Sequence, residues 1–102
     1  MPLGSGALMP QESAIWLAIR LKALADPMRL QLLAHLLRQP EGEDCTCNLA
    51  PLVNLSEPTV SHHLKRLESA GLLIKQRRGS SVYYRVVPEA ITAIAQVLHV
   101  GR

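Results

Sequence analysis

Cys45 and Cys47 are the only cysteines of the 102-residue chain, and a single residue separates them. Thiolates are soft ligands that suit As(III), Sb(III), Cd(II), Pb(II), Zn(II) and Cu(I). Residues this close in sequence rarely meet the geometry of a disulfide, so we expect free thiols in a reducing compartment. The sequence predicts that they open a short helix ending near Val53. Residues two apart do not face each other on a regular helix. One ion held by both sulfurs would therefore require an irregular or distorted first turn.

A helix-turn-helix is predicted directly after this segment. Asn54 and Leu55 suit a turn, and Ser56 is a suitable N-cap for a helix that runs to Ala70. Three apolar residues recur at helical spacing and are expected to face inward: Val60, Leu64 and Leu67. His63 lies against this inner side, so we expect it to have a structural role. The opposite side of the helix is then free to enter a DNA major groove.

The outward side chains of this helix are polar and can reach base edges or phosphates. They are Thr59, Ser61, His62, Lys65 and Arg66. A hairpin follows, with strands predicted at 75–78 and 82–87, and its tip carries further groups suited to a phosphate or a minor groove: Arg77, Arg78, Ser80 and Ser81. Between Ser56 and Arg85 the chain has a local charge of +4, against +3 for the whole chain. The predicted DNA-contacting segment is therefore also the basic segment.

The flanking helices complete the predicted fold. Ser13 to Ala25 indicates a helix that is apolar on nearly every side, so a domain this small needs a partner subunit to bury it. Asp26 and Pro27 start a second helix, and Glu89 to about His99 forms the last one. The order of four helices, two strands and one helix predicts a mainly α winged helix-turn-helix with a β-hairpin wing. We expect one domain at 12–100 after a flexible N-terminus at 1–11.

Other classes of protein are not favoured. No apolar run approaches the roughly 20 residues of a membrane span, and residues 1–6 lack the regions of a signal peptide, so we expect a cytoplasmic protein. The chain suggests no Ser-His-Asp or Cys-His set and no glycine-rich phosphate loop, so we do not expect an enzyme.

Four stretches of the chain, taken in order, resemble the signatures of the ArsR/SmtB family of bacterial metal- and metalloid-responsive transcriptional repressors. They are residues 23–30, 55–67, 70–73 and 79–84. The resemblance covers roughly Ala14 to His99. It implies a homodimer, paired through the first and last helices, that binds an inverted-repeat operator and blocks transcription. Cys45-Thr46-Cys47 resembles the family's arsenic-site motif, and Glu43 and Leu49 also occupy matching positions. The resemblance therefore implies release from DNA when As(III) or Sb(III) binds Cys45 and Cys47.

Departures from the family pattern leave alternatives open. Ala50 stands where many arsenic sensors have a third cysteine, and Asn48 stands where the motif has an acid. The family's zinc-site positions on the last helix fall at Pro88 and Ala90, which are not ligands. Two thiolates suit As(III) or Sb(III) better than a four-coordinate, sulfur-rich cadmium site. The alternatives are a sensor of Cd, Pb or Zn, a sensor of thiol oxidation, cysteines that are only small buried apolar residues, and a winged helix used for protein–protein contact.

Overall fold

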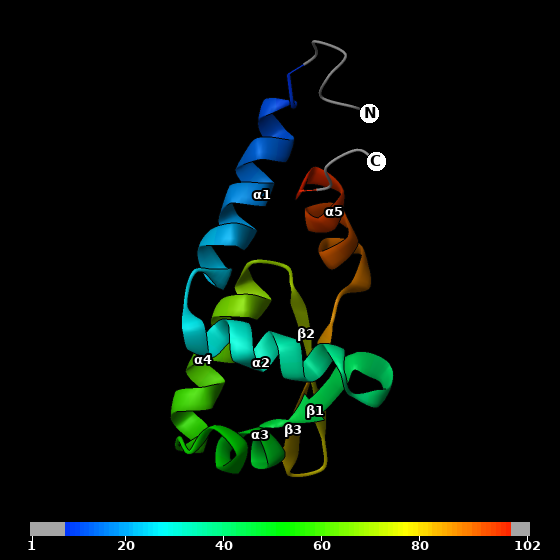
Figure 1. The fold of residues 1–102 in the computed structure, drawn as a ribbon. Coiled ribbons are helices and arrows are strands. Elements are labelled where there is room, and N and C mark those ends of the chain that lie inside the picture. The colour runs from blue at the N-terminus through cyan, green and yellow to red at the C-terminus, as the bar shows by residue number, and fades with distance from the viewer. Residues whose placement is uncertain (1–7, 99–102) are drawn as a thin grey trace.

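The computed structural model describes residues 8–98 (Figure 1). The α-helices are α1 (Gln11–Leu24), α2 (Pro27–Leu37), α3 (Thr46–Val53), α4 (Glu57–Ser69) and α5 (Pro88–Leu98). The strands are β1 (Glu43–Cys45), β2 (Leu73–Arg78) and β3 (Ser81–Val86), and a short 3-10 turn, η2 (Pro40–Gly42), precedes β1. This is the mainly helical winged helix-turn-helix that the sequence predicts. The flexible segment predicted at 1–11 falls largely at 1–7, outside the described residues, as does His99.

Local side-chain chemistry explains where the central helices begin. The Asp26 carboxylate accepts hydrogen bonds from the backbone N–H groups of Met28 and Arg29, at 2.9 and 3.1 Å, and caps α2. The Ser56 hydroxyl accepts from the N–H of Thr59 at 3.3 Å and caps α4. Both caps are the ones predicted from the sequence. They fix the start of each helix, and therefore which side chains α4 presents outward.

The strand β1 was not predicted. It pairs antiparallel with β3, so the predicted hairpin is in fact a three-stranded sheet in the order β1-β3-β2. In this register Glu43 lies opposite Arg85 and Cys45 lies opposite Tyr83. Three residues are too few to show an alternating pattern, and the strand forms only because β3, distant in sequence, offers it an edge. The cysteine segment thereby joins the sheet that carries the wing.

The core lies between the helix-turn-helix and the inner face of the sheet. Its largest fully buried side chains come from α2, α3, α4, the turn after α4 and the sheet: Leu32, Leu36, Leu49, Val60, Leu64, Leu67, Leu72, Leu73 and Tyr84. The three inward residues predicted for α4 are all fully buried. Burial of each such side chain contributes about 1.5–3 kcal/mol, so the orientation of α4 is strongly fixed.

Helices α1 and α5 extend from one end of the molecule (Figure 1), and α5 reaches the core through Ala90 and Ile94. No residue of α1 is buried, and Ile15, Trp16 and Ile19 expose 52%, 55% and 44% of their surface. On α5, Leu98 is also exposed, at 62%. An exposed apolar surface of this kind is typical of an interface, which agrees with the partner subunit expected from the sequence. Within residues 8–98, no helix is both long and apolar enough to cross a membrane.

Candidate thiol site and DNA-binding surface

Cys45 and Cys47 lie on either side of the junction between β1 and α3. Cys45 ends the strand and is the N-cap of α3, with an extended backbone (φ −95°, ψ 157°), and Cys47 is in the first turn. Their Cα atoms are 5.2 Å apart, and the two sulfurs form a disulfide. The prediction of free thiols is thus wrong for this structure. The sequence argument placed both residues on one helix, whereas the extended backbone at Cys45 turns its sulfur toward the first turn. The irregularity that the spacing requires is the strand–helix junction itself.

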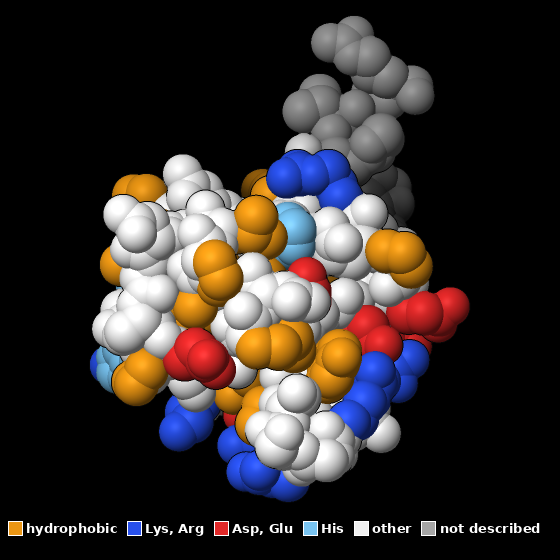
Figure 2. Space-filling view, turned by 90° about the horizontal axis from the view of Figure 1, so that it is seen from below, with side chains coloured by type: hydrophobic (Ala, Val, Ile, Leu, Met, Phe, Trp, Pro, Cys, Tyr) orange, Lys and Arg blue, Asp and Glu red, His pale blue; other side chains and the backbone are white. Residues whose placement is uncertain are grey.

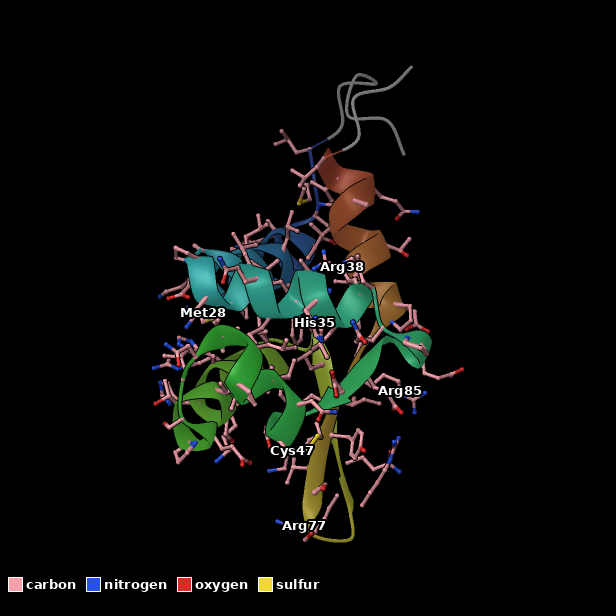
Figure 3. All side chains as sticks on the ribbon, turned by 60° about the horizontal axis from the view of Figure 1, so that its bottom comes forward. Met28, His35, Arg38, Cys47, Arg77 and Arg85 are labelled. Atoms are coloured by element: carbon pink, nitrogen blue, oxygen red, sulfur yellow. A yellow bond between two sulfur atoms is a disulfide. The ribbon has the colours of Figure 1, made fainter. Side chains whose placement is uncertain are left out.

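The two sulfurs differ in their surroundings. Cys45 is only 1% exposed, whereas Cys47 is exposed at the surface. The backbone N–H of Asn48 donates a hydrogen bond to the Cys45 sulfur at 3.3 Å. This N–H is one of the donors at the N-terminal end of α3 that have no partner within the helix itself. Figure 3 shows Cys47 beside the sheet, where it can be reached from solvent.

Asp44 ties this junction to α2. Its carboxylate accepts from the Cys45 N–H at 2.8 Å and from the Asn48 side chain at 2.9 Å, and the His35 Nε2 lies 3.2 Å away. Burial alone would raise the pKa of Asp44, but these hydrogen bonds outweigh it and hold the pKa below its ordinary value. No motif or spacing predicts that His35, nine residues before Asp44, belongs to this site. Asn48, which departs from the family motif, has a clear local role here.

The cysteines are not joined by further ligands. Across residues 8–98, no three or more His, Cys, Asp or Glu side chains lie close enough to hold a metal ion. Ala50, at the position of the third cysteine in many arsenic sensors, is buried. The described part of the chain therefore offers two sulfurs, and any third ligand has to come from elsewhere.

The predicted DNA-contacting residues of α4 fall into two groups. Thr59, His62, Lys65 and Arg66 are exposed, as predicted. Ser61 is half-buried and faces the core. The Tyr84 hydroxyl is buried beneath α4 with no hydrogen-bond partner among the described residues. Burial raises the pKa of Tyr84, and Ser61 lies close enough to oppose this shift.

His63 occupies the inner edge of α4, where the sequence predicts a structural role. It is half-buried, and its Nδ1 lies 3.5 Å from the guanidinium of Arg29 on α2. This contact links α4 to α2. It agrees with the structural role and with the omission of His63 from the DNA-contacting set.

The predicted DNA-contacting residues of the wing also differ in how exposed they are and in whether they are paired within the protein. Arg77 and Ser80 are exposed, Ser81 is half-buried, and Arg77 lies near the far end of the wing (Figure 3). The Arg78 side chain instead forms an ion pair with Glu43 on β1. Figure 2 shows the face that carries α3 and the wing, where several Lys and Arg side chains gather along one part and acidic side chains adjoin some of them. The structure therefore brings the tip of the wing and the start of α4 to one end of the molecule. Of the two wing arginines, Arg77 is exposed and Arg78 is paired with Glu43.

Comparison with known proteins places these features in one family. The family model described as "Bacterial regulatory protein, arsR family" matches residues 26–75. The arsenic resistance transcriptional regulators ArsR1 and ArsR2 of Pseudomonas putida are 44% identical over 68 residues and 40% identical over 79 residues. These matches cover 67% and 78% of this chain, but only 52% and 67% of the two relatives. The chain thus spans about half to two thirds of the length of these relatives.

Two solved structures share the fold. The AntR antimony-specific transcriptional repressor is 31% identical, with a TM-score of 0.72 over 90% of this chain and 82% of its own. The homodimeric winged helix-turn-helix DNA-binding domain Mb0332 from Mycobacterium bovis is 28% identical, with a TM-score of 0.71 over 90% of this chain and 85% of its own.

Proposed function

The chain belongs to the ArsR family of bacterial regulatory proteins, and from that premise we propose that it is a repressor that senses a trivalent metalloid. It binds operator DNA as a homodimer and is released when As(III) or Sb(III) binds the thiolates of Cys45 and Cys47. The observation that carries this proposal is the convergence of the two sulfurs at the β1–α3 junction, with Cys47 open to solvent.

The donor set suits a trivalent metalloid. As(III) and Sb(III) bind thiolates strongly and take three ligands in simple complexes, so two sulfurs leave one position for solvent. A tetrahedral Zn(II) or Cd(II) site would need further protein ligands, and residues 8–98 gather no such cluster. The inducer can act only on the reduced pair, so the disulfide must first accept two electrons and two protons to give two thiols.

The dimer and the DNA surface rest on separate features. The exposed apolar face of α1 and α5 would be buried between two subunits, and the similar Mb0332 domain is homodimeric. The proposed DNA contacts are the exposed polar residues of α4 and the wing: Thr59, His62, Lys65, Arg66, Arg77 and Ser80. Ser61, Arg78 and Ser81, which the sequence also predicts as contacts, are left out of this set because each is half-buried or engaged within the protein. A symmetric pair of such surfaces fits a two-fold operator.

The test is fluorescence anisotropy of the reduced protein on the DNA upstream of its own gene, titrated with arsenite. Release at near-stoichiometric arsenite is expected for the wild type. Cys45→Ser and Cys47→Ser should bind this DNA normally and fail to release. Leu52→Ser is the matched control, because Leu52 is an exposed residue of the same helix and lies away from the sulfurs. Normal release by both cysteine variants would refute the sensor assignment.

The disulfide itself favours a second candidate, a sensor of thiol oxidation. In this function two thiols and hydrogen peroxide would give the disulfide and two waters, and the oxidised dimer would leave DNA. The discriminating measurement compares the DNA affinity of the reduced and oxidised proteins without metalloid. Equal affinities would exclude redox sensing, and a loss of affinity on oxidation that thiol reductant reverses would establish it.

A further inference from the structure

Arg78 ends β2, directly before the turn of the wing, and each of its three guanidinium nitrogens donates a hydrogen bond within the protein. Its two terminal nitrogens donate to the two carboxylate oxygens of Glu43, each at 2.8 Å. Nε and Nη2 also donate to the Gln76 side-chain oxygen, at 3.2 and 2.8 Å. The guanidinium lies over the ring of Tyr83, 4.3 Å from its centre. These contacts, here called the Arg78 clasp, use the same fork of donors that would bind a DNA phosphate.

The neighbouring arginine gives the contrast. Arg77 occupies the next position on β2, so its side chain points to the other face of the sheet. It is exposed, and no other described residue forms an ion pair with it. The two adjacent wing arginines therefore lie on opposite faces of the sheet, and among the described residues a carboxylate occupies the donors of Arg78 but not those of Arg77.

We propose that Glu43 competes with DNA phosphate for Arg78, so that the clasp keeps one wing cation per protomer off the DNA while Arg77 makes the phosphate contact. This inference rests on the proposed DNA-binding function. The clasp lies at the surface, where 40% of the Arg78 side chain and 18% of the Glu43 side chain are exposed. A surface ion pair contributes little to folding. Exchange of its carboxylate for a phosphate would therefore alter DNA affinity with little effect on the fold.

Glu43 has a second cationic neighbour besides Arg78. Arg85 lies opposite Glu43 in the sheet, with its Nε 3.9 Å from the carboxylate. Glu43 would therefore keep a cationic neighbour if Arg78 turned away toward DNA.

The Arg78 clasp also includes β1, the strand that carries Cys45. Glu43 precedes Cys45 by two residues on β1, so their side chains lie on the same face. Cys45 is paired across the sheet with Tyr83, whose ring supports Arg78. A displacement of β1 at the sulfurs would consequently move both the carboxylate and the aromatic support of the clasp.

The experiment measures how the DNA affinity of the reduced, full-length protein depends on salt. The probe is a duplex of the DNA upstream of its own gene, and the proteins are wild type, Glu43→Gln, Arg78→Gln, the double variant and Arg77→Gln. Each phosphate contact contributes about 0.9 to the slope of log affinity against log salt. In a dimer, Glu43→Gln should steepen the slope by about 1.8 and tighten binding at low salt. Arg78→Gln and the double variant should match the wild-type slope, and Arg77→Gln should flatten it by about 1.8.

Other results would overturn the inference. An Arg78→Gln protein that loses as much slope as Arg77→Gln would show that Arg78 already contacts DNA, and an unchanged slope for Glu43→Gln would show that no cation was withheld. If Glu43→Gln fails to fold, Glu43→Asp replaces it, because the shorter side chain cannot keep both bonds to Arg78. Arsenite titration of the same proteins separates the two proposals. If arsenite does not release the wild-type protein from DNA, the metalloid-sensor proposal is refuted, and the salt slopes still test the competition between Glu43 and DNA. If the DNA binding of the wild-type protein does not depend on salt, both proposals are refuted.

Discussion

The salt dependence of DNA binding should be set by three unpaired cations in each protomer. Lys65, Arg66 and Arg77 are exposed, and none of them forms an ion pair with another described residue. Six such cations in a dimer predict a slope of about −5.4 for log affinity against log salt, from about 0.9 per neutralised phosphate. Affinity should then fall by about 10³ between about 50 and about 200 mM salt. If Arg78 also contacted DNA in both protomers, the slope would approach about −7.2.

The assay for this count is a series of anisotropy titrations at increasing salt, with the protein reduced and free of metalloid. Lys65→Gln and Arg66→Gln should each flatten the slope by about 1.8 in the dimer, because each variant removes two phosphate contacts. They should weaken binding to operator and unrelated duplexes by similar factors, since phosphates carry no sequence information. Lys75→Gln is the matched control, because Lys75 is an exposed cation of β2 outside the predicted DNA-contacting set. A slope much shallower than about −3, or one that Lys65→Gln leaves unchanged, would refute this surface.

Three further predictions concern the junction, the core and the apolar helices. Asp44→Asn should lower the free energy of unfolding by about 1–3 kcal/mol at neutral pH, because it removes a charged acceptor from Asn48 and the Cys45 N–H. Since the pKa of folded Asp44 is lowered, this stabilisation is present above the ordinary aspartate pKa and is lost as pH falls through the folded value, so denaturation curves of the two proteins should converge in acid. Tyr84→Phe should leave the free energy of unfolding unchanged or raise it by up to about 1 kcal/mol, because the buried hydroxyl has no hydrogen-bond partner among residues 8–98; a clear loss in urea titration would reveal a bond between that hydroxyl and the nearby Ser61. Ile15→Glu should shift sedimentation toward monomer, because the exposed apolar face of α1 is proposed to pair; an unaltered dimer would place the interface elsewhere.

Most of the fold could be predicted from local signals. Each of these signals involves residues only a few positions apart: the caps at Asp26 and Ser56, and the spacing of apolar residues on α4. The structure confirms all three. Strand β1 could not be predicted this way. Its three residues form a strand only through hydrogen bonds to β3, which lies about forty residues later in the chain. A non-local partner of this kind leaves no periodic trace in the strand it stabilises.

The candidate site shows the same division. The cysteines and the outward residues of α4 were identified from residue type and spacing, because both signals are local. The disulfide was missed because the spacing rule applies to two residues of one helix, and Cys45 is extended. The partner of Arg78 was missed for a different reason. A run of basic residues predicts a phosphate contact, but only the sheet register shows that Glu43, on a strand the sequence did not reveal, lies within reach of that arginine.

The position of the sulfurs explains how one small ligand could act on two DNA-contacting elements at once. Cys45 belongs to β1, which is hydrogen-bonded to the wing strand β3, whereas Cys47 belongs to α3, which packs against α4. A ligand that bridges the two sulfurs therefore sets the angle between the sheet and the helix-turn-helix. The wing and α4 must contact the same DNA duplex at once, so DNA binding tolerates little change in that angle. A ligand shifts such an equilibrium only by its difference in affinity between the two forms. Such a difference in affinity arises if the distance between the two sulfurs that suits the bound ligand differs from their distance in the DNA-bound form. Variants that lock the junction without a ligand should then fix DNA affinity at one value, whether or not arsenite is present.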